Sequence, residues 1–319
     1  MLRRFLAGAA LSALLLTGCG QDQGQATVEI GAVTIVSHPS LDAIYEGFKE
    51  GLAEAGYVEG KNLTLDFQNP QGDQQTLANI TSKFASSDDD LFLTIATPPT
   101  QSLAQAVTDR PIVFASVTEP VGAGLVDSME KPGHNVTGTS DQIPPGLQLD
   151  RLQQILPGVK TLGIVYTSKE INAEFQAAAM SQAAKARGIE VKTVTITDSA
   201  EVAQAAASLD VDAYWVGNDN TVVSAIEAVV QAAEEKGSLL FTSDADSVVR
   251  GAAASLATDY KAQGKQTAKI AVKILKGADP ASTPVEIQES LEFTVNPEAA
   301  RRMGVEIPAD VIASADHTV

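Results

Sequence analysis

The chain has 319 residues, of which 44% are hydrophobic and 19% charged, and this length and composition favour a globular protein of two domains. Its formal net charge of −18 argues against a nucleic-acid partner, because phosphate binding needs a concentrated basic surface. The single cysteine, Cys19, excludes an intrachain disulfide.

The amino-terminal segment has the pattern of an export signal. Two arginines precede an apolar stretch over residues 5–16, which is too short to span a membrane as a helix. The stretch ends in LTGC (16–19), which resembles a bacterial lipobox and thereby implies cleavage before Cys19 and lipidation of its thiol. We expect a signal peptide over 1–18, a lipidated tether over 19–27, and an exported protein anchored to the cell membrane, facing the periplasm or cell exterior. The alternative is a plain signal peptide with a coincidental cysteine.

From residue 32 onward, short β-branched runs alternate with longer amphipathic, alanine-rich runs. The expected strands cover residues 32–37, 63–68, 91–96, 111–117, 161–167, 191–197, 212–218 and 239–243. The expected helices cover residues 41–55, 73–86, 99–107, 171–187, 199–208, 221–236 and 261–276. The pattern restarts at residue 161, so it predicts an α/β protein with two doubly wound parallel-sheet lobes of similar topology.

Two segments have the composition of connections between the lobes. Residues 136–146 contain glycine, serine and paired prolines, which suit a crossover rather than a core element. Residues 256–260 form a second candidate crossover, and an extended run over 285–295 precedes a short helix from Pro297. These crossover segments are expected to form a hinge.

Several longer motifs carry a resemblance to a known family. They are HPSLDAIYEGFKEGLAEAGYVEGKN (38–62), IATPPTQ (95–101), TEPVGAGLV (118–126), PGHNVTGTSD (132–141), GNDNTVVSAIEAVV (217–230) and AVKILKGADP (271–280). With these motifs the chain resembles the bacterial ABC-transporter substrate-binding family whose best-known members bind tryptophan and related aromatic amino acids. One departure is Glu119, where the family pattern has an aspartate that reaches about one methylene less far.

The resemblance implies a fold, a lobe division and partners. The fold is the type I periplasmic-binding-protein fold. The first lobe comprises residues 28–138 plus 257–284, and the second comprises 139–256 plus 285–319. The implied function is the extracytoplasmic solute-binding component of an ABC importer, a monomer that delivers its ligand to a permease and its ATPase.

Polar and aromatic residues follow the predicted strands of both lobes. Ligands of open α/β sheets bind beyond the carboxyl ends of the strands, so these residues are the binding candidates. They are His38, Ser40, Thr97, Thr100, Thr118, Glu119, Asp141, Tyr166, Ser168, Asn172, Asn218, Asp219, Asn220 and Asp244. Helix starts favour a carboxylate and the acidic residues favour an ammonium, so a zwitterionic amino acid fits, with aromatic ones first by the resemblance.

Each candidate also has a purely structural interpretation. Serine, threonine, aspartate and asparagine at helix starts commonly serve only as caps. Tyr166 could stack on a ligand ring, whereas Trp215 lies inside a predicted strand and is interpreted as a core residue.

Sequence motifs for catalysis and cofactors are missing. The three histidines have no metal-site spacing, and neither a G-x-S-x-G elbow nor a complete phosphate-binding loop occurs. We therefore expect no catalytic residue, no metal and no cofactor. The leading hypothesis is a transport receptor; the alternatives are a ligand-sensing subunit for a membrane receptor or kinase and, less favoured, a lipoprotein enzyme.

Overall fold

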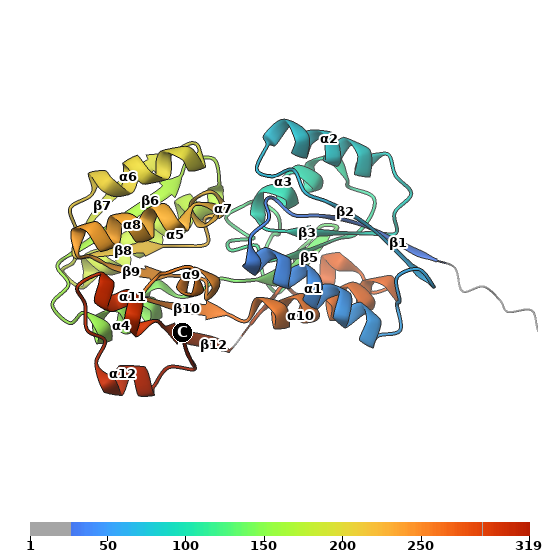
Figure 1. Ribbon diagram of the computed structural model, residues 1–319. Helices are drawn as coiled ribbons and strands as arrows, with labels where there is room; N and C mark the ends of the chain where they lie inside the picture. Colours follow the sequence, from blue (N-terminus) through green and yellow to red (C-terminus); the bar gives the residue numbers. More distant parts are fainter. Residues whose placement is uncertain (1–26, 289) are drawn as a thin grey trace, which may run out of the picture.

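The computed structural model describes residues 27–288 and 290–319, which form two α/β lobes lying side by side (Figure 1). The expected signal peptide, Cys19 and nearly all of the tether lie outside the described residues. Within the described ranges, no helix is both long and apolar enough to cross a membrane.

The first lobe is built on a parallel sheet with the strand order β11-β5-β4-β3-β1-β2. Its strands are β1 (Val28–Val33), β2 (Leu63–Gln68), β3 (Leu91–Ile95), β4 (Ile112–Ala115), β5 (Val136–Ser140) and β11 (Glu286–Ile287). The helices of this lobe are α1 (Pro39–Glu54), α2 (Gln74–Ala85), α3 (Thr97–Ala106) and α10 (Tyr260–Leu275), with a 3₁₀ turn η2 (Pro280–Ser282). The order of its first five strands is the doubly wound arrangement, with a switch point between β1 and β3.

The second lobe has the order β13-β12-β10-β9-β8-β6-β7. Its strands are β6 (Thr161–Thr167), β7 (Glu190–Ile196), β8 (Ala213–Val216), β9 (Leu239–Thr242), β10 (Ala254–Thr258), β12 (Leu291–Val295) and β13 (His317–Thr318). Its helices are α4 (Pro145–Ile155), α5 (Ile171–Ala186), η1 (Ser199–Glu201), α6 (Val202–Ser208), α7 (Asn220–Ser224), α8 (Ile226–Lys236), α9 (Asp246–Val249), α11 (Pro297–Arg302) and α12 (Ala309–Ala313). Strands β6 to β10 repeat the doubly wound order, which confirms the predicted similarity of the two lobes; only the β10–β12 pairing is antiparallel in the described part of this sheet.

The interpretation of residues 136–146 as a crossover alone was wrong. Residues 136–140 form β5, and every residue of this strand is buried. The strand can be buried despite its polar composition because its hydroxyls are hydrogen-bonded: Thr137 donates to Thr283 O at 2.7 Å, and Thr139 pairs with the Thr267 hydroxyl at 2.8 Å.

Two further sequence expectations differ from the structure. The first strand lies at 28–33 rather than 32–37, because it pairs with β2 and β3 over those residues. The helix expected over 221–236 is divided at Ala225 into α7 and α8. The Arg250 guanidinium donates to the carbonyls of Val223 and Ser224 at this break, at 2.8 and 3.4 Å, and so stabilises it.

The chain crosses between the two sheets three times. The crossings lie between β5 and α4, between β10 and α10, and between β11 and β12. Each crossing lies a few residues after the lobe boundary that the sequence predicted. The strands before the crossings, β5, β10 and β11, end at Ser140, Thr258 and Ile287, whereas the expected boundaries follow residues 138, 256 and 284. The lobe division itself stays a prediction.

Helix α10 follows a strand of the second sheet but packs against α1 in the first lobe (Figure 1). The two backbones touch, because a Cβ added to Gly47 would lie 2.1 Å from Lys261 O, and one added to Gly264 would lie 2.1 Å from Ile44 O. Lys261 and Lys265 form ion pairs with Glu50 beside this contact. The helix pair is therefore a rigid part of the first lobe.

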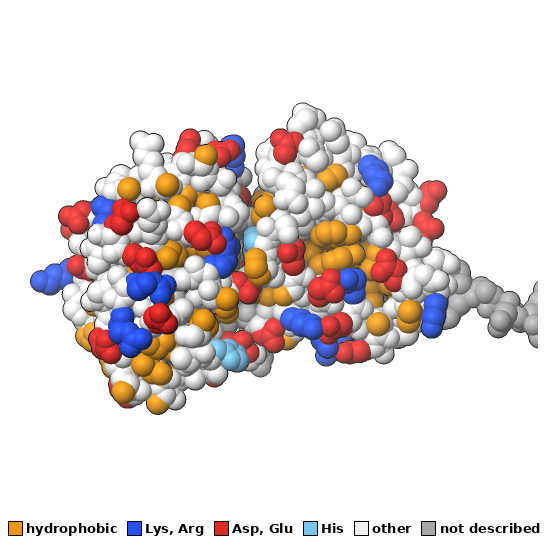
Figure 2. Space-filling view, in the orientation of Figure 1, with side chains coloured by type: hydrophobic (Ala, Val, Ile, Leu, Met, Phe, Trp, Pro, Cys, Tyr) orange, Lys and Arg blue, Asp and Glu red, His pale blue; other side chains and the backbone are white. Residues whose placement is uncertain are grey.

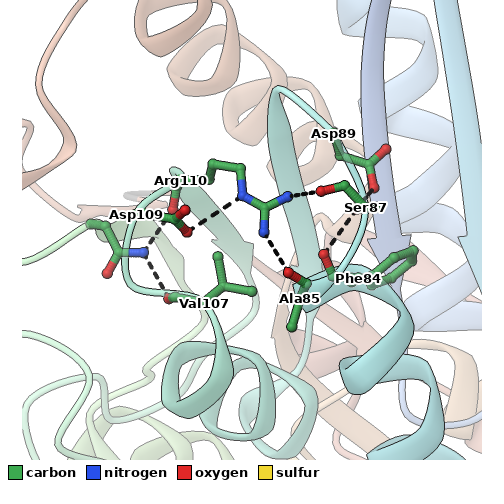
Figure 3. A network of polar contacts seen from close by, with 8 residues as sticks. Phe84, Ala85, Ser87, Asp89, Val107, Asp109 and Arg110 are labelled. Carbon is green, nitrogen blue, oxygen red and sulfur yellow. Dashed lines mark hydrogen bonds and ion pairs between the residues drawn. The ribbon is translucent and has the colours of Figure 1, made fainter.

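Arg110 lies where the strands of the first sheet begin, at the end remote from their carboxyl ends, and it connects three loops there (Figure 3). Its guanidinium donates to Ser87 O at 2.5 Å and to Ala85 O at 3.0 Å, at the carboxyl end of α2, where a cation is favoured. Asn135 donates to the carbonyls of Val107 and Arg110 at 3.0 and 2.7 Å. This network fixes the amino ends of β3, β4 and β5.

We predict that Gly47→Ala lowers the free energy of unfolding by about 1–3 kcal/mol, because its methyl group would force α1 away from α10. Gly158→Ala is the matched control, since an added Cβ there meets no atom within 4 Å. Urea denaturation of both variants measures the difference. Equal stability of the two would contradict the close helix contact.

Candidate ligand-binding site

The carboxyl ends of strands from both lobes face one another around a partly open pocket, here called the polar cavity. Figure 2 shows the two lobes meeting along a furrow. Most of the sequence candidates come together in the lining of this cavity. They are His38, Ser40, Thr97, Thr118, Asp141, Asn172, Asn218, Asp219, Asn220 and Asp244.

A second pocket, here called the apolar cavity, shares Thr118 and Asn218 with the first. Its lining includes the aromatic rings of Phe175 and Trp215, and Glu119, the eleventh candidate, also borders it. Trp215 is only 3% exposed and packs in the core as the sequence indicated, yet the same ring borders this cavity.

Three candidates lie outside both cavities. The buried Thr100 hydroxyl pairs with the Thr94 hydroxyl and donates to Ala96 O, both locally. The Ser168 hydroxyl donates to Ile196 O. Tyr166 lies in an outer hollow of the second lobe between β7 and the outer face of α5, because side chains on a strand alternate between the two faces of the sheet. From there its ring does not reach a ligand in either cavity.

Two hydrogen bonds join the lobes at the polar cavity. Asn218, after β8, donates from Nδ2 to Asp141 Oδ2 at 2.7 Å, and Asp141 follows β5 of the other lobe. Ser40, at the start of α1, donates to Asp246 Oδ2 at 2.8 Å. Ser116 adds a third contact within the first lobe, donating to Asp141 Oδ2 at 2.6 Å.

The lining of the polar cavity holds buried polar atoms that have no hydrogen-bond partner among the described residues. They are Asp141 Oδ1, Asn172 Oδ1, Asn218 Oδ1, Thr97 Oγ1 and His38 Nδ1. Buried polar groups are almost always paired, so a cluster of unpaired ones marks a place that a ligand completes. Three of the five atoms are carbonyl or carboxylate oxygens, which accept hydrogen bonds from a donor-rich group.

Burial dominates the titration of the acidic groups here. Burial raises the pKa of Asp141, against the hydrogen bonds from Ser116 and Asn218. Burial, and then the nearby Glu170 carboxylate, raise the pKa of Asp219 to about 8, while backbone N–H groups of Thr167 and Val222 act in the opposite direction.

The cavity has few positive charges to offset these acids. Burial raises the pKa of Asp244. Burial also lowers the pKa of His38, although the nearby Asp244 carboxylate raises it again in part. Among the residues that the structure describes, neither lysine nor arginine lines the polar cavity. The cavity therefore favours a positively charged group.

Two helix starts border the same space. Helix α1 begins at Pro39, and the N–H groups of Ser40 and Leu41 belong to its first turn, which lacks intrahelical acceptors. Helix α3 begins at Thr97, whose hydroxyl is unpaired. The dipoles of both helices favour an anionic group at this side of the cavity.

Sequence reasoning missed Glu170, which lies behind the cavity. Its buried carboxylate accepts from Asn220 Nδ2 at 2.5 Å and from Thr221 Oγ1 at 3.0 Å, and so fixes the start of α7. In the sequence it stands next to Lys169 before a helix and looks like a solvated charge. Ser116, Tyr260 and Phe175 were also missed.

Two lining residues have left-handed backbone conformations that glycine usually adopts. Ala96 has φ 80° and ψ 165°, and Ser116 has φ 58°. Such conformations cost roughly 1–3 kcal/mol in non-glycine residues and cluster at ligand sites. No signal in the sequence reveals them. Within the described ranges, no group of three or more histidine, cysteine or acidic residues is arranged to hold a metal ion.

Comparison with known proteins decides the family. Residues 29–319 match the profile of the ABC transporter substrate binding proteins. The chain belongs to this family. It is 35% identical over 310 residues to the tyrosine-binding protein of Clostridioides difficile strain R20291, covering 93% of this chain and 90% of that protein.

Solved structures of family members agree with the fold. The chain superposes on a Streptococcus pneumoniae protein in complex with L-Trp with a TM-score of 0.89, at 36% identity over 92% of this chain and all of that one. It matches a ligand-free, open substrate-binding protein of Clostridium difficile with a TM-score of 0.71, at 36% identity over 92% and 99% of the two chains. The predicted type I periplasmic-binding-protein fold is confirmed, and this family of substrate-binding proteins acts outside the cytoplasm.

We predict that Ala96→Gly leaves this substrate-binding protein at least about 1 kcal/mol more stable than Ala115→Gly. Both alanines are buried and adjoin the carboxyl ends of neighbouring strands, but only Ala96 has a positive φ. Glycine relieves strain at Ala96 and merely loses a methyl group at Ala115. If denaturant unfolding shows the same loss of unfolding free energy in both variants, Ala96 is not strained.

Proposed function

We propose that this protein captures an aromatic amino acid between its lobes and delivers it to an ABC permease. The observation that carries the proposal is the cluster of unpaired buried polar atoms in the polar cavity, next to a cavity lined by Phe175 and Trp215. An aromatic α-amino acid has an ammonium and a carboxylate at one end and an apolar ring at the other. These two ends match the polar cavity and the apolar cavity.

The ammonium belongs with Asp141. Oδ1 of Asp141, Asn172 and Asn218 supply three acceptors, and an ammonium has three N–H donors. The Asp141 carboxylate makes one of these hydrogen bonds charge-assisted, which is roughly twice as strong as a neutral one. The carboxylate of the ligand then faces Thr97 and the start of α1, where free N–H groups and helix dipoles stabilise it.

The aromatic side chain belongs in the apolar cavity. The rings of Phe175 and Trp215 offer flat apolar surfaces, and Ile143, Pro145 and Ala179 complete the wall. The Phe175 ring lies so close to Gly122 of the first lobe that a Cβ there would be 2.8 Å away, so the ring closes this end. The L-Trp complex and the tyrosine-binding relative support an aromatic ligand.

Ligand binding is coupled to lobe closure. At equal identity, the chain resembles the L-Trp complex more closely than the ligand-free, open relative, with TM-scores of 0.89 and 0.71. The Asn218–Asp141 hydrogen bond joins the lobes in this arrangement. We propose that the closed form docks on the permease, with the exported chain held at the membrane through a lipid on Cys19.

Calorimetric titration of the purified protein with tryptophan, tyrosine and non-aromatic amino acids tests the proposal. We expect saturable binding of aromatic amino acids, and Asp141→Asn should weaken it about 100-fold because a buried partner of the ammonium loses its charge. Asp88→Asn, in an exposed loop, is the control and should bind as the unaltered protein does. No binding of any aromatic amino acid by folded, ligand-free protein would refute the proposal.

Affinity should also fall on acidification. Because burial raises the pKa of Asp141, protonation of this carboxyl competes with the ammonium as the pH falls through that raised pKa. The dissociation constant then rises by up to about tenfold per pH unit. The pH dependence of the stability of the ligand-free protein has the opposite sign. Because the folded protein holds this proton more tightly than the unfolded chain does, its stability decreases as the pH rises from the ordinary carboxyl pKa to the raised one. Titrations from pH 8 to pH 5 should show this dependence, and Asp141→Asn should reduce it; identical pH dependence in both proteins would exclude Asp141 as its source.

A further inference from the structure

Glu119 is a carboxylate at the border of the apolar cavity, next to Phe175 and Trp215. It is half-buried, and Gln142 donates to its Oε1 from Nε2. Among the described residues no other hydrogen bond reaches this carboxylate, so Oε2 retains its capacity to accept one. Burial raises the pKa of Glu119, in keeping with the absence of a cationic partner for this carboxylate among the described residues.

Two of the glutamines that line the apolar cavity already have hydrogen-bond partners. Gln148 Oε1 accepts from Trp215 Nε1 at 3.1 Å, and Gln148 Nε2 donates to Ser243 Oγ at 2.8 Å. Gln176 Oε1 accepts from the backbone N–H of Asn218 at 2.7 Å. Among the described residues that line this cavity, Glu119 supplies the one carboxylate, and the unpaired Asn218 Oδ1 is assigned to the ammonium. A ligand ring here therefore meets a charged acceptor with free capacity.

We infer that Glu119 is the specificity-determining residue of this site, selecting aromatic side chains that carry an O–H or N–H donor. The inference rests on the proposed function. A phenol or an indole donates to the carboxylate as the ring displaces water from it, whereas a phenyl ring removes the water and supplies no donor. A buried polar group left without a partner discriminates strongly against the ligand that lacks the donor.

The first experiment needs no variant. Calorimetric titration compares tyrosine, tryptophan, phenylalanine and O-methyltyrosine, which keeps the ring and the oxygen of tyrosine but lacks the donor. We expect phenylalanine and O-methyltyrosine to bind at least about tenfold more weakly than the better of tyrosine and tryptophan. If all four bind within threefold of one another, the proposed function stands and this inference is overturned.

The second experiment assigns the selectivity to Glu119. Glu119→Met keeps the length of the side chain and removes the acceptor, so it should strengthen phenylalanine binding, weaken tyrosine binding and bring their ratio to about one. Glu174→Met is the matched control, because Glu174 is exposed on the outer face of α5, and it should retain the selectivity. An unchanged ratio in folded Glu119→Met overturns the inference. Failure of every aromatic amino acid to bind the unaltered protein refutes the proposed function and the inference with it.

Discussion

The carboxylate of Asp141 is buried where the two lobes meet, and the arrangement of the site depends on it. One oxygen accepts from Ser116 of its own lobe and from Asn218 of the other, while the second oxygen has no partner among the described residues. A buried charge with half of its hydrogen-bonding capacity unused is costly without a cation. In the proposed function, the lobes therefore close favourably when a ligand supplies the missing donors.

Backbone strain acts in the same direction. Ala96 and Ser116 end neighbouring strands with positive φ angles and present their side chains to the polar cavity. This strain and the buried acids lower the stability of the protein without ligand, and in the proposed function the free energy of ligand binding offsets that cost. A ligand that binds only the closed form shifts the population toward it by the free energy of binding.

The sequence predicted the fold well where the pattern is local. The helix expected over 73–86 is capped by Asp73, whose side chain accepts from the Thr76 N–H, and the helix expected to end at 236 ends before the left-handed Gly237. The prediction failed for β5, because the hydroxyls that allow its burial find partners such as Thr267 and Thr283, far away in the sequence.

The site followed from one rule, that ligands bind beyond the carboxyl ends of parallel strands, and this rule placed eleven of the candidates at the two cavities. It could not tell which face of a strand end a side chain occupies, so it misplaced Tyr166. It also could not find Phe175 or Tyr260, which are ordinary apolar positions in the sequence and reach the cavities only through the approach of the lobes.

Tyr260 shows how the connections between the lobes take part in binding. It is the first residue of α10, directly after the crossing from β10, and its ring borders the polar cavity. Helix α10 is held to α1 by the backbone contact at Gly47 and Gly264, so it must move with the first lobe although its preceding strand belongs to the second. In the proposed closure, rotation at this crossing is thereby confined to the backbone from Thr258 to Tyr260, with Asp259 between them. In the proposed function, a ligand in the polar cavity contacts Tyr260 at this crossing as well as both lobes, and this contact couples binding to closure.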